Sequence, residues 1–249
     1  MAKQKLYALD FDGVICDSAV ETGITGWKVA SQLWQDMPAK TPTDIINQFR
    51  EVRPVMETGY EAILIIRLLF EGASPERLLN DFNGSINALL ERENLTIDKL
   101  KTLFGETRDH WINRDLVDWV EMNPLFDGIS SKLNKIDPKQ CYIITTKQER
   151  FVSHILDANN LTLPPEQIFG LDRKLSKQQI LADLSIINPE HTILFVEDRL
   201  PTLKNVIDVE RLADIELFFA GWGYNTQQDK QAALALPVTS INLAGFTSL

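Results

Sequence analysis

Apolar runs of strand length occur at both ends of the chain, and a long helical pattern separates the first run from the rest. The first run, residues 6–9, leads directly into Asp10, Asp12 and Gly13. Its length and unbroken apolar character are typical of a strand buried on both faces of a parallel sheet. Further runs of this kind occupy residues 141–146, 167–170, 192–198, 215–220 and 238–241.

Residues 18–121 follow a different pattern, in which apolar positions recur at helical spacing and no convincing strand is found. One helix is expected to start with Thr41 as its cap and Pro42 at the first helical position. Strands separated by helices of this length predict a parallel sheet with right-handed crossovers. We therefore expect a doubly wound α/β core of residues 1–17 and 122–249, with an all-helical insert between them.

Asp10 and Asp12 are two carboxylates, one residue apart, at the end of a predicted strand. Residues two apart in a strand point to the same face, and open α/β sheets bind ligands at the carboxyl ends of their strands. Two close carboxylates repel, so the pKa of at least one rises unless a cation lies between them. The pair therefore predicts a metal and phosphate site.

Other polar groups follow predicted strands and should meet the aspartates at one edge of the sheet. They are Thr145 with Thr146, Glu197 with Asp198, and a lysine, either Lys177 or Lys174. Several carboxylates in one place need a hard cation, and oxygen ligands suit Mg²⁺. A hydroxyl and a lysine can hold a phosphoryl group, while one carboxylate attacks phosphorus and its neighbour transfers protons.

Taken in order, these motifs resemble those of the haloacid dehalogenase-like (HAD) superfamily. Residues 10–14 match its first motif, Asp-x-Asp-x-Thr/Val, and residues 143–145 match the second, an apolar strand ending in Thr or Ser. A lysine ahead of a helix matches the third, and residues 195–198 resemble the fourth. The tail at residues 221–224 is similar to the segment that follows the last core strand in proteins of this superfamily. The resemblance implies a Rossmann-like core with a helical cap, as in phosphoglycolate phosphatase-like members.

The resemblance implies four catalytic residues. Asp10 would attack phosphorus and form an aspartyl-phosphate, and Asp12 would act as general acid and base. Thr145 would donate a hydrogen bond to the transferring phosphoryl group, and Lys177 would neutralise charge on Asp10 and the phosphate. Lys174 fits another form of the third motif, so both lysines remain candidates for the motif lysine, and Lys177 is preferred.

The resemblance also implies Mg²⁺ as the cofactor. Asp10, Asp12 and Asp198 would hold the ion, and Glu197 would contribute through a water molecule. The family often has Gly-Asp-x-x-x-Asp in its fourth motif, whereas here Glu197 replaces the glycine and Thr202 the second acid. The presence of Asp12 favours phosphoryl chemistry, because the metal-free dehalogenases of the superfamily lack this second aspartate.

The insert is expected to be a cap that closes over the site, excludes water and selects the substrate. Arg53 and Tyr60 are candidate contacts from the cap, and Thr146 is a candidate from the core. Arg53 and Thr146 each have a structural alternative. Arg53 would be a salt-bridged structural residue, Thr146 would cap the next helix, and Tyr60 has only its position in its favour.

Charge and composition restrict the partners. The 249 residues carry a formal net charge of −10, which disfavours nucleic acid and anionic membrane surfaces. Cys16 and Cys141 lack metal-site spacing and are expected to be buried thiols in a reducing compartment. No stretch approaches membrane-spanning length, and Met1–Lys5 leaves no room for a signal sequence, so we expect a cytoplasmic protein.

The expected function is Mg²⁺-dependent hydrolysis of a small phosphorylated metabolite, such as phosphoglycolate, a sugar phosphate or a nucleotide monophosphate. Three alternatives stay open. The first is phosphotransfer of the β-phosphoglucomutase type. The second is carbon–phosphorus cleavage, for which related phosphonatases need a cap lysine, here Lys28 or Lys40. The third is a non-catalytic binding module that retained the fold. The sequence leaves the oligomeric state open.

Overall fold

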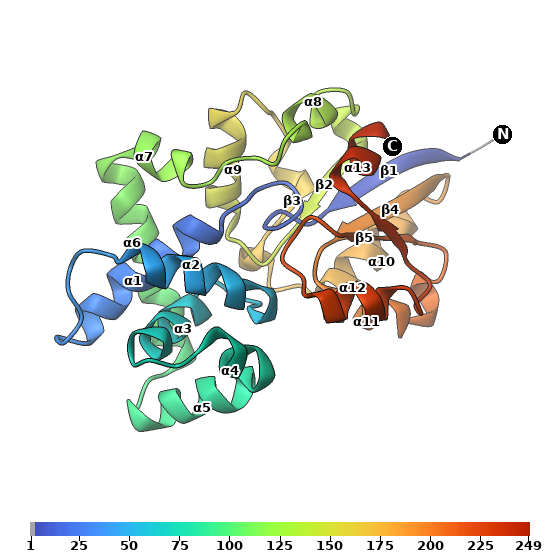
Figure 1. Ribbon diagram of the computed structural model, residues 1–249. Helices are drawn as coiled ribbons and strands as arrows, with labels where there is room; N and C mark the ends of the chain where they lie inside the picture. The colour runs from blue at the N-terminus through green and yellow to red at the C-terminus, as the bar shows by residue number, and fades with distance from the viewer. Residues whose placement is uncertain (1–2) are drawn as a thin grey trace. The chain divides into compact units, whose positions relative to one another are not determined.

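The computed structural model describes residues 3–249, which divide into two compact units (Figure 1). The core unit contains the chain up to Asp17 and from Pro124 to Leu249, and the helical unit contains Ser18–Asn123. No helix formed by residues 3–249 combines the length and the hydrophobicity needed to cross a bilayer. Cys16 and Cys141 are buried free thiols, as expected.

A six-stranded parallel sheet forms the centre of the core unit. Its strands are β1 (Gln4–Leu9), β2 (Cys141–Ile144), β3 (Ile168–Phe169), β4 (His191–Glu197), β5 (Glu216–Ala220) and β6 (Thr239–Ile241). They lie in the order β3-β2-β1-β4-β5-β6, and every neighbouring pair is parallel. The chain moves outward in opposite directions on the two sides of β1. This creates a topological switch point at the carboxyl end of β1, where such sheets bind ligands.

Helices cover the sheet of the core unit. They are α8 (Ile129–Leu133), α9 (Glu149–Ala158), α10 (Lys177–Ile187), α11 (Leu200–Ile207), α12 (Gln227–Ala233) and α13 (Leu243–Ser248). Figure 1 shows α10, α11 and α12 on one side of the sheet and α8 and α13 on the other. Leu6 and Phe195 from the strands pack with Leu181 and Leu203 from α10 and α11 in one hydrophobic cluster. The predicted doubly wound α/β core is confirmed.

The register of the central strands determines where their polar ends lie. Leu9 of β1 pairs with Ile143 of β2 and with Val196 of β4. The backbone N–H of Asp10 donates to the carbonyl of Val196 at 2.9 Å, so the ladder continues one residue past β1. The three strands therefore end at the same edge of the sheet.

The helical unit contains seven α-helices and, among residues 18–123, no strand. The helices are α1 (Ala19–Leu33), α2 (Thr43–Val52), α3 (Glu61–Phe70), α4 (Pro75–Asn80), α5 (Phe82–Arg92), α6 (Ile97–Arg114) and α7 (Leu116–Glu121). Their apolar faces form one core around Trp27, Phe49 and the run Ile63–Ile66. The predicted start of α2 is wrong: Pro42, in extended conformation, takes the cap position, and the helix begins at Thr43.

Candidate active site

The carboxyl ends of β1, β2 and β4 bring the predicted polar residues of the core together. Asp10 follows β1, Thr145 follows β2, and Glu197 ends β4 with Asp198 next in the chain. All four side chains are buried. Charged groups are rarely buried unless they are paired or coordinate a metal, so this edge of the sheet is the candidate site.

The turn after β1 needs glycine for two reasons. Gly13 has a φ of +91°, which favours glycine, and a Cβ atom built there would lie 2.0 Å from Oδ2 of Asp198. Gly223, in the loop after β5, also lies against Asp198, since a Cβ atom built there would lie 2.3 Å from the Asp198 Cβ. The backbone N–H of Tyr224 then donates to Asp198 Oδ2 at 2.6 Å. Two close backbone segments therefore hold the Asp198 carboxylate in place.

Lys177, the first residue of α10, lies between two carboxylates. Its Nζ is 2.9 Å from Asp10 Oδ1 and 2.7 Å from Glu197 Oε2. A capping box between Ser176 and Gln179 fixes the start of α10 and thereby the position of Lys177. Burial disfavours the charged amine, but the carboxylates of Asp10 and Glu197 outweigh it and raise the pKa of Lys177 above its usual value. The site therefore contains a permanent ammonium group at neutral pH.

The electrostatics of the cluster favour a bound cation. Burial, as the largest effect, and the Glu197 carboxylate raise the pKa of Asp10, Lys177 lowers it, and the net result is a pKa of about 7. Asp10, Glu197 and Asp198 each offer a carboxylate oxygen, and these oxygens all lie within 4.8 Å of one another. Three buried oxygen donors in this arrangement fit Mg²⁺, which prefers carboxylate ligands. Glu197 also accepts a hydrogen bond from the Arg199 N–H at 2.9 Å, so its carboxylate has structural partners as well.

Comparison with known proteins was made by sequence and by structure. No family model matches the sequence, and no curated protein matches it. Solved structures match along nearly the whole chain. A predicted phosphatase from Clostridium acetobutylicum is 14% identical with a TM-score of 0.57, covering 100% of this chain and 98% of its own. A predicted phosphoglycolate phosphatase from Haemophilus somnus is 15% identical with a TM-score of 0.57, covering 92% of each chain.

A haloacid dehalogenase-like hydrolase from Streptococcus pneumoniae is 14% identical with a TM-score of 0.55, covering 99% of this chain and 96% of its own. The chain has the HAD-like fold. At these identities the likeness shows the fold, and the reaction has to be argued from the site. The fold implied by the sequence motifs is thus confirmed over the core and the insert together.

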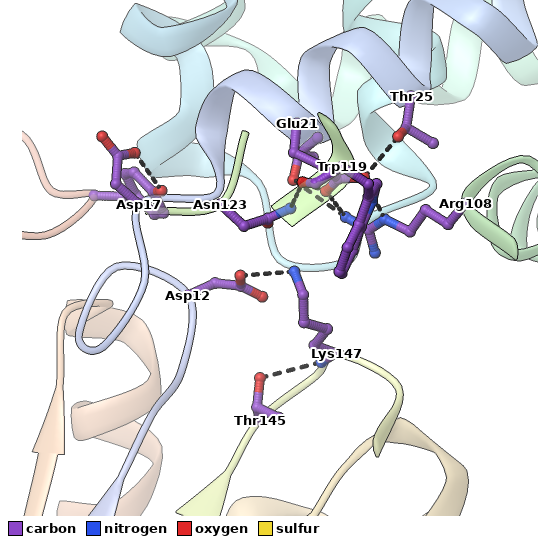
Figure 2. A network of polar contacts seen from close by, with 11 residues as sticks. Asp12, Asp17, Glu21, Thr25, Arg108, Trp119, Asn123, Thr145 and Lys147 are labelled. Atoms are coloured by element: carbon purple, nitrogen blue, oxygen red, sulfur yellow. Dashed lines mark hydrogen bonds and ion pairs between the residues drawn. The ribbon is translucent and has the colours of Figure 1, made fainter. Parts of the chain in front are cut away.

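Lys147 is the residue that the motif analysis of this HAD-like core missed. Its Nζ lies 2.8 Å from Asp12 Oδ1, and its side chain is only 1% exposed (Figure 2). Its backbone N–H also donates to Thr145 Oγ1 at 3.1 Å. The available signal was a lysine two residues after a predicted strand-end threonine. Lys147 therefore supplies a second buried ammonium group to the site and fixes the side chain of Asp12.

The tail after β5 contributes more than packing. The indole N–H of Trp222 donates to the Val14 carbonyl at 3.2 Å, and the Tyr224 hydroxyl donates to Asp17 Oδ1 at 2.8 Å. These bonds attach the tail to the turn after β1. Together with the Tyr224 N–H on Asp198, they make residues 222–224 part of the frame of the site.

The remaining predicted site residues are placed as follows. Thr146 is half-buried beside Thr145, and the cap residue of α9 is Gln148, so Thr146 does not cap that helix. Lys177, not Lys174, contacts Asp10; Lys174 ends a short 3₁₀ turn with a φ of +55°. Arg53 is buried in the helical unit, where its Nη1 donates to the Met56 carbonyl at 3.2 Å. Contacts of Thr146 and Arg53 with a substrate stay predictions.

Proposed function

We propose that this protein is a Mg²⁺-dependent phosphatase that hydrolyses a small phosphomonoester through an aspartyl-phosphate on Asp10. The observation that carries the proposal is the Lys177 ammonium group between Asp10 and Glu197 at the switch point of a HAD-like sheet. A carboxylate next to a fixed cation can attack a phosphoryl dianion, because the cation offsets the repulsion between the two anions.

The cation site belongs to the proposal. The carboxylates of Asp10, Glu197 and Asp198 would hold Mg²⁺, with Asp12 as a further expected ligand. When bound, the ion neutralises charge on the phosphoryl oxygens. Its presence would also keep Asp10 ionised near neutral pH, against the raised pKa that burial imposes.

In the first half-reaction, a carboxylate oxygen of Asp10 forms a bond to phosphorus while the bond to the ester oxygen breaks. Asp12 gives its proton to the departing alkoxide, which leaves as an alcohol. In the second, Asp12 takes a proton from water, and the water oxygen attacks phosphorus, which releases inorganic phosphate and restores the Asp10 carboxylate. Lys177 stays protonated through both steps and stabilises the charge on the phosphoryl oxygens.

Two further contacts support these roles. Thr145 Oγ1 accepts a hydrogen bond from the Lys147 N–H, so its own hydroxyl proton can point to a phosphoryl oxygen. Lys147 holds Asp12 by an ion pair of 2.8 Å, and this pair would keep the proton-transferring carboxylate in one position.

The helical unit is proposed as the cap that selects the substrate, because it is inserted directly after the turn that follows Asp12. Arg53 and Tyr60 remain its candidate contacts with the part of the substrate that does not react. We expect the partner to be a small phosphorylated metabolite, and we expect the protein to act in the cytoplasm.

The test is phosphate release from p-nitrophenyl phosphate by the purified protein, with Mg²⁺ and with EDTA. Activity should require Mg²⁺, and Asp10→Asn should lower kcat by about a thousandfold or more, because it removes the nucleophile. Asp214→Asn makes the same chemical change at an exposed residue of the core unit and should leave the rate unchanged. An Asp10→Asn variant with wild-type activity would contradict the nucleophile assignment. Mg²⁺ binding without turnover of any phosphate ester would favour a binding module.

A further inference from the structure

A second cluster of cationic side chains lies in the helical unit, around a pocket of about 350 Å³ between α1 and α6. Its lining includes Lys28 and Gln32 from α1, and Thr107, His110, Trp111 and Arg114 from α6. None of its lining residues is acidic. In a chain with a net charge of −10, this pocket brings together a lysine, an arginine and a histidine without a carboxylate.

Lys28 is the residue that makes the pocket unusual. Its Nζ lies 2.9 Å from the centroid of the Trp111 ring, and its side chain is half-buried. Burial and the neighbouring Arg114 cation lower the pKa of Lys28 to about 8, while the more weakly acting carboxylates of Asp118 and Glu21 oppose the shift. The ammonium group is therefore held in the pocket at an energetic cost.

The two acids that act on Lys28 have other partners. Asp118 accepts the indole N–H of Trp111 at 2.6 Å. Glu21 accepts a hydrogen bond from Arg108 Nε at 2.8 Å, in the network that Figure 2 shows. Among residues 3–249, no carboxylate lies within ion-pair distance of Lys28 or Arg114. The two cations of the pocket thus have no direct ion-pair partner among the described residues.

We propose that this pocket binds a small oxyanion, a phosphate or a carboxylate group, between Lys28 and Arg114. Such an anion would offset the repulsion between the two cations, and the Thr107 hydroxyl and the Gln32 amide offer uncharged hydrogen-bond donors beside it. All residues of this site belong to the helical unit, and none of them takes part in the proposed phosphatase chemistry. Either proposal can therefore fail without the other.

The probe is the indole N–H signal of Trp111 in ¹⁵N-labelled full-length protein, identified by its loss in Trp111→Phe. Inorganic phosphate and malonate are titrated separately, with the ionic strength held constant by KCl. We expect a saturable shift of this signal with at least one of the two anions. A response to phosphate alone, to malonate alone or to both supports the site and tells which oxyanion it accepts.

Lys28→Gln should weaken the binding at least tenfold. Lys99→Gln removes the same charge from the exposed first turn of α6 and should leave the binding within twofold of wild type. Arg114→Gln, at an exposed position, gives a second test if Lys28→Gln does not fold, and it too should weaken binding at least tenfold. The proposal is overturned if the signal does not move with either anion, if KCl alone moves it equally, or if Lys99→Gln weakens binding as much as Lys28→Gln.

Discussion

Lys147 shows how much one buried side chain can determine in this site. Its ammonium group holds Asp12, and its backbone N–H occupies the acceptor side of the Thr145 hydroxyl. No strand, helix or charge pattern in the sequence indicates that this lysine turns inward, because its direction depends on the loop after β2. Its contribution to catalysis is therefore the first matter to test.

Lys147→Met should lower kcat/KM for p-nitrophenyl phosphate by about 10- to 100-fold, since small displacements of a proton-transferring group are costly. Asp12 keeps some access to water, with a side chain 15% exposed, so the loss of its partner should not unfold the protein. Lys139→Met, at an exposed position of the same unit, should keep the wild-type kcat/KM. Equal activity of the two variants would show that Lys147 does not contribute to catalysis.

Replacing Gly13 or Gly72 by alanine separates backbone strain from steric crowding, because the two residues have nearly the same φ angle, +91° and +92°. Alanine in this region of φ costs about 1–2 kcal/mol at either position. At Gly13 the new Cβ would also displace the Asp198 carboxylate, whereas at Gly72 no atom lies within 4 Å. Thermal unfolding should show both variants destabilised and only Gly13→Ala unresponsive to Mg²⁺. Stabilisation of Gly13→Ala by Mg²⁺ to the wild-type extent would show that Asp198 does not hold the ion.

At the scale of elements, the carboxyl ends of the strands were the predictable part of the site. Apolar runs fix the strands, and parallel pairing places Asp10, Thr145 and Glu197 at one edge whatever the loops do. Loop geometry was not predictable in the same way. The roles of Lys147 and of the tail at 222–224 depend on turns that no periodic pattern specifies. The start of α2 was displaced by one residue because Pro42 adopts an extended conformation.

The capping box at the N-terminus of α10 positions Lys177. Ser176→Ala removes the hydroxyl that accepts the Gln179 N–H, and should lower the free energy of unfolding by about 1 kcal/mol. Ser74→Ala removes the equivalent cap from α4 of the helical unit and should cost about the same. Only Ser176→Ala should also lower kcat/KM, by several-fold. If the two variants keep equal activity, the Asp10 and Glu197 ion pairs alone position Lys177.

At the scale of the whole molecule, a net charge of −10 coexists with local clusters of cationic side chains. Lys177 and Lys147 create local positive potential among the carboxylates of the core unit, and Lys28 with Arg114 does so in the helical unit. This distribution suits small anionic ligands and disfavours polyanions, which would meet the net charge of −10 first. In the proposed function, the core unit performs the chemistry and the insert selects the substrate.

The central claim, an aspartyl-phosphate on Asp10, can be tested directly by chemical trapping. The Asp12→Asn variant, in which hydrolysis of the intermediate should be slowed, is mixed with a phosphorylated substrate and Mg²⁺, quenched in acid and reduced with borohydride. Reduction converts an aspartyl-phosphate into homoserine, which peptide mass spectrometry locates in the sequence. We predict homoserine at position 10, dependent on substrate and Mg²⁺ and absent when Asp10 is replaced by Asn. Turnover of the substrate by the wild-type protein, with Asp10 unmodified in the trapped variant or with homoserine at another aspartate, would contradict the assignment.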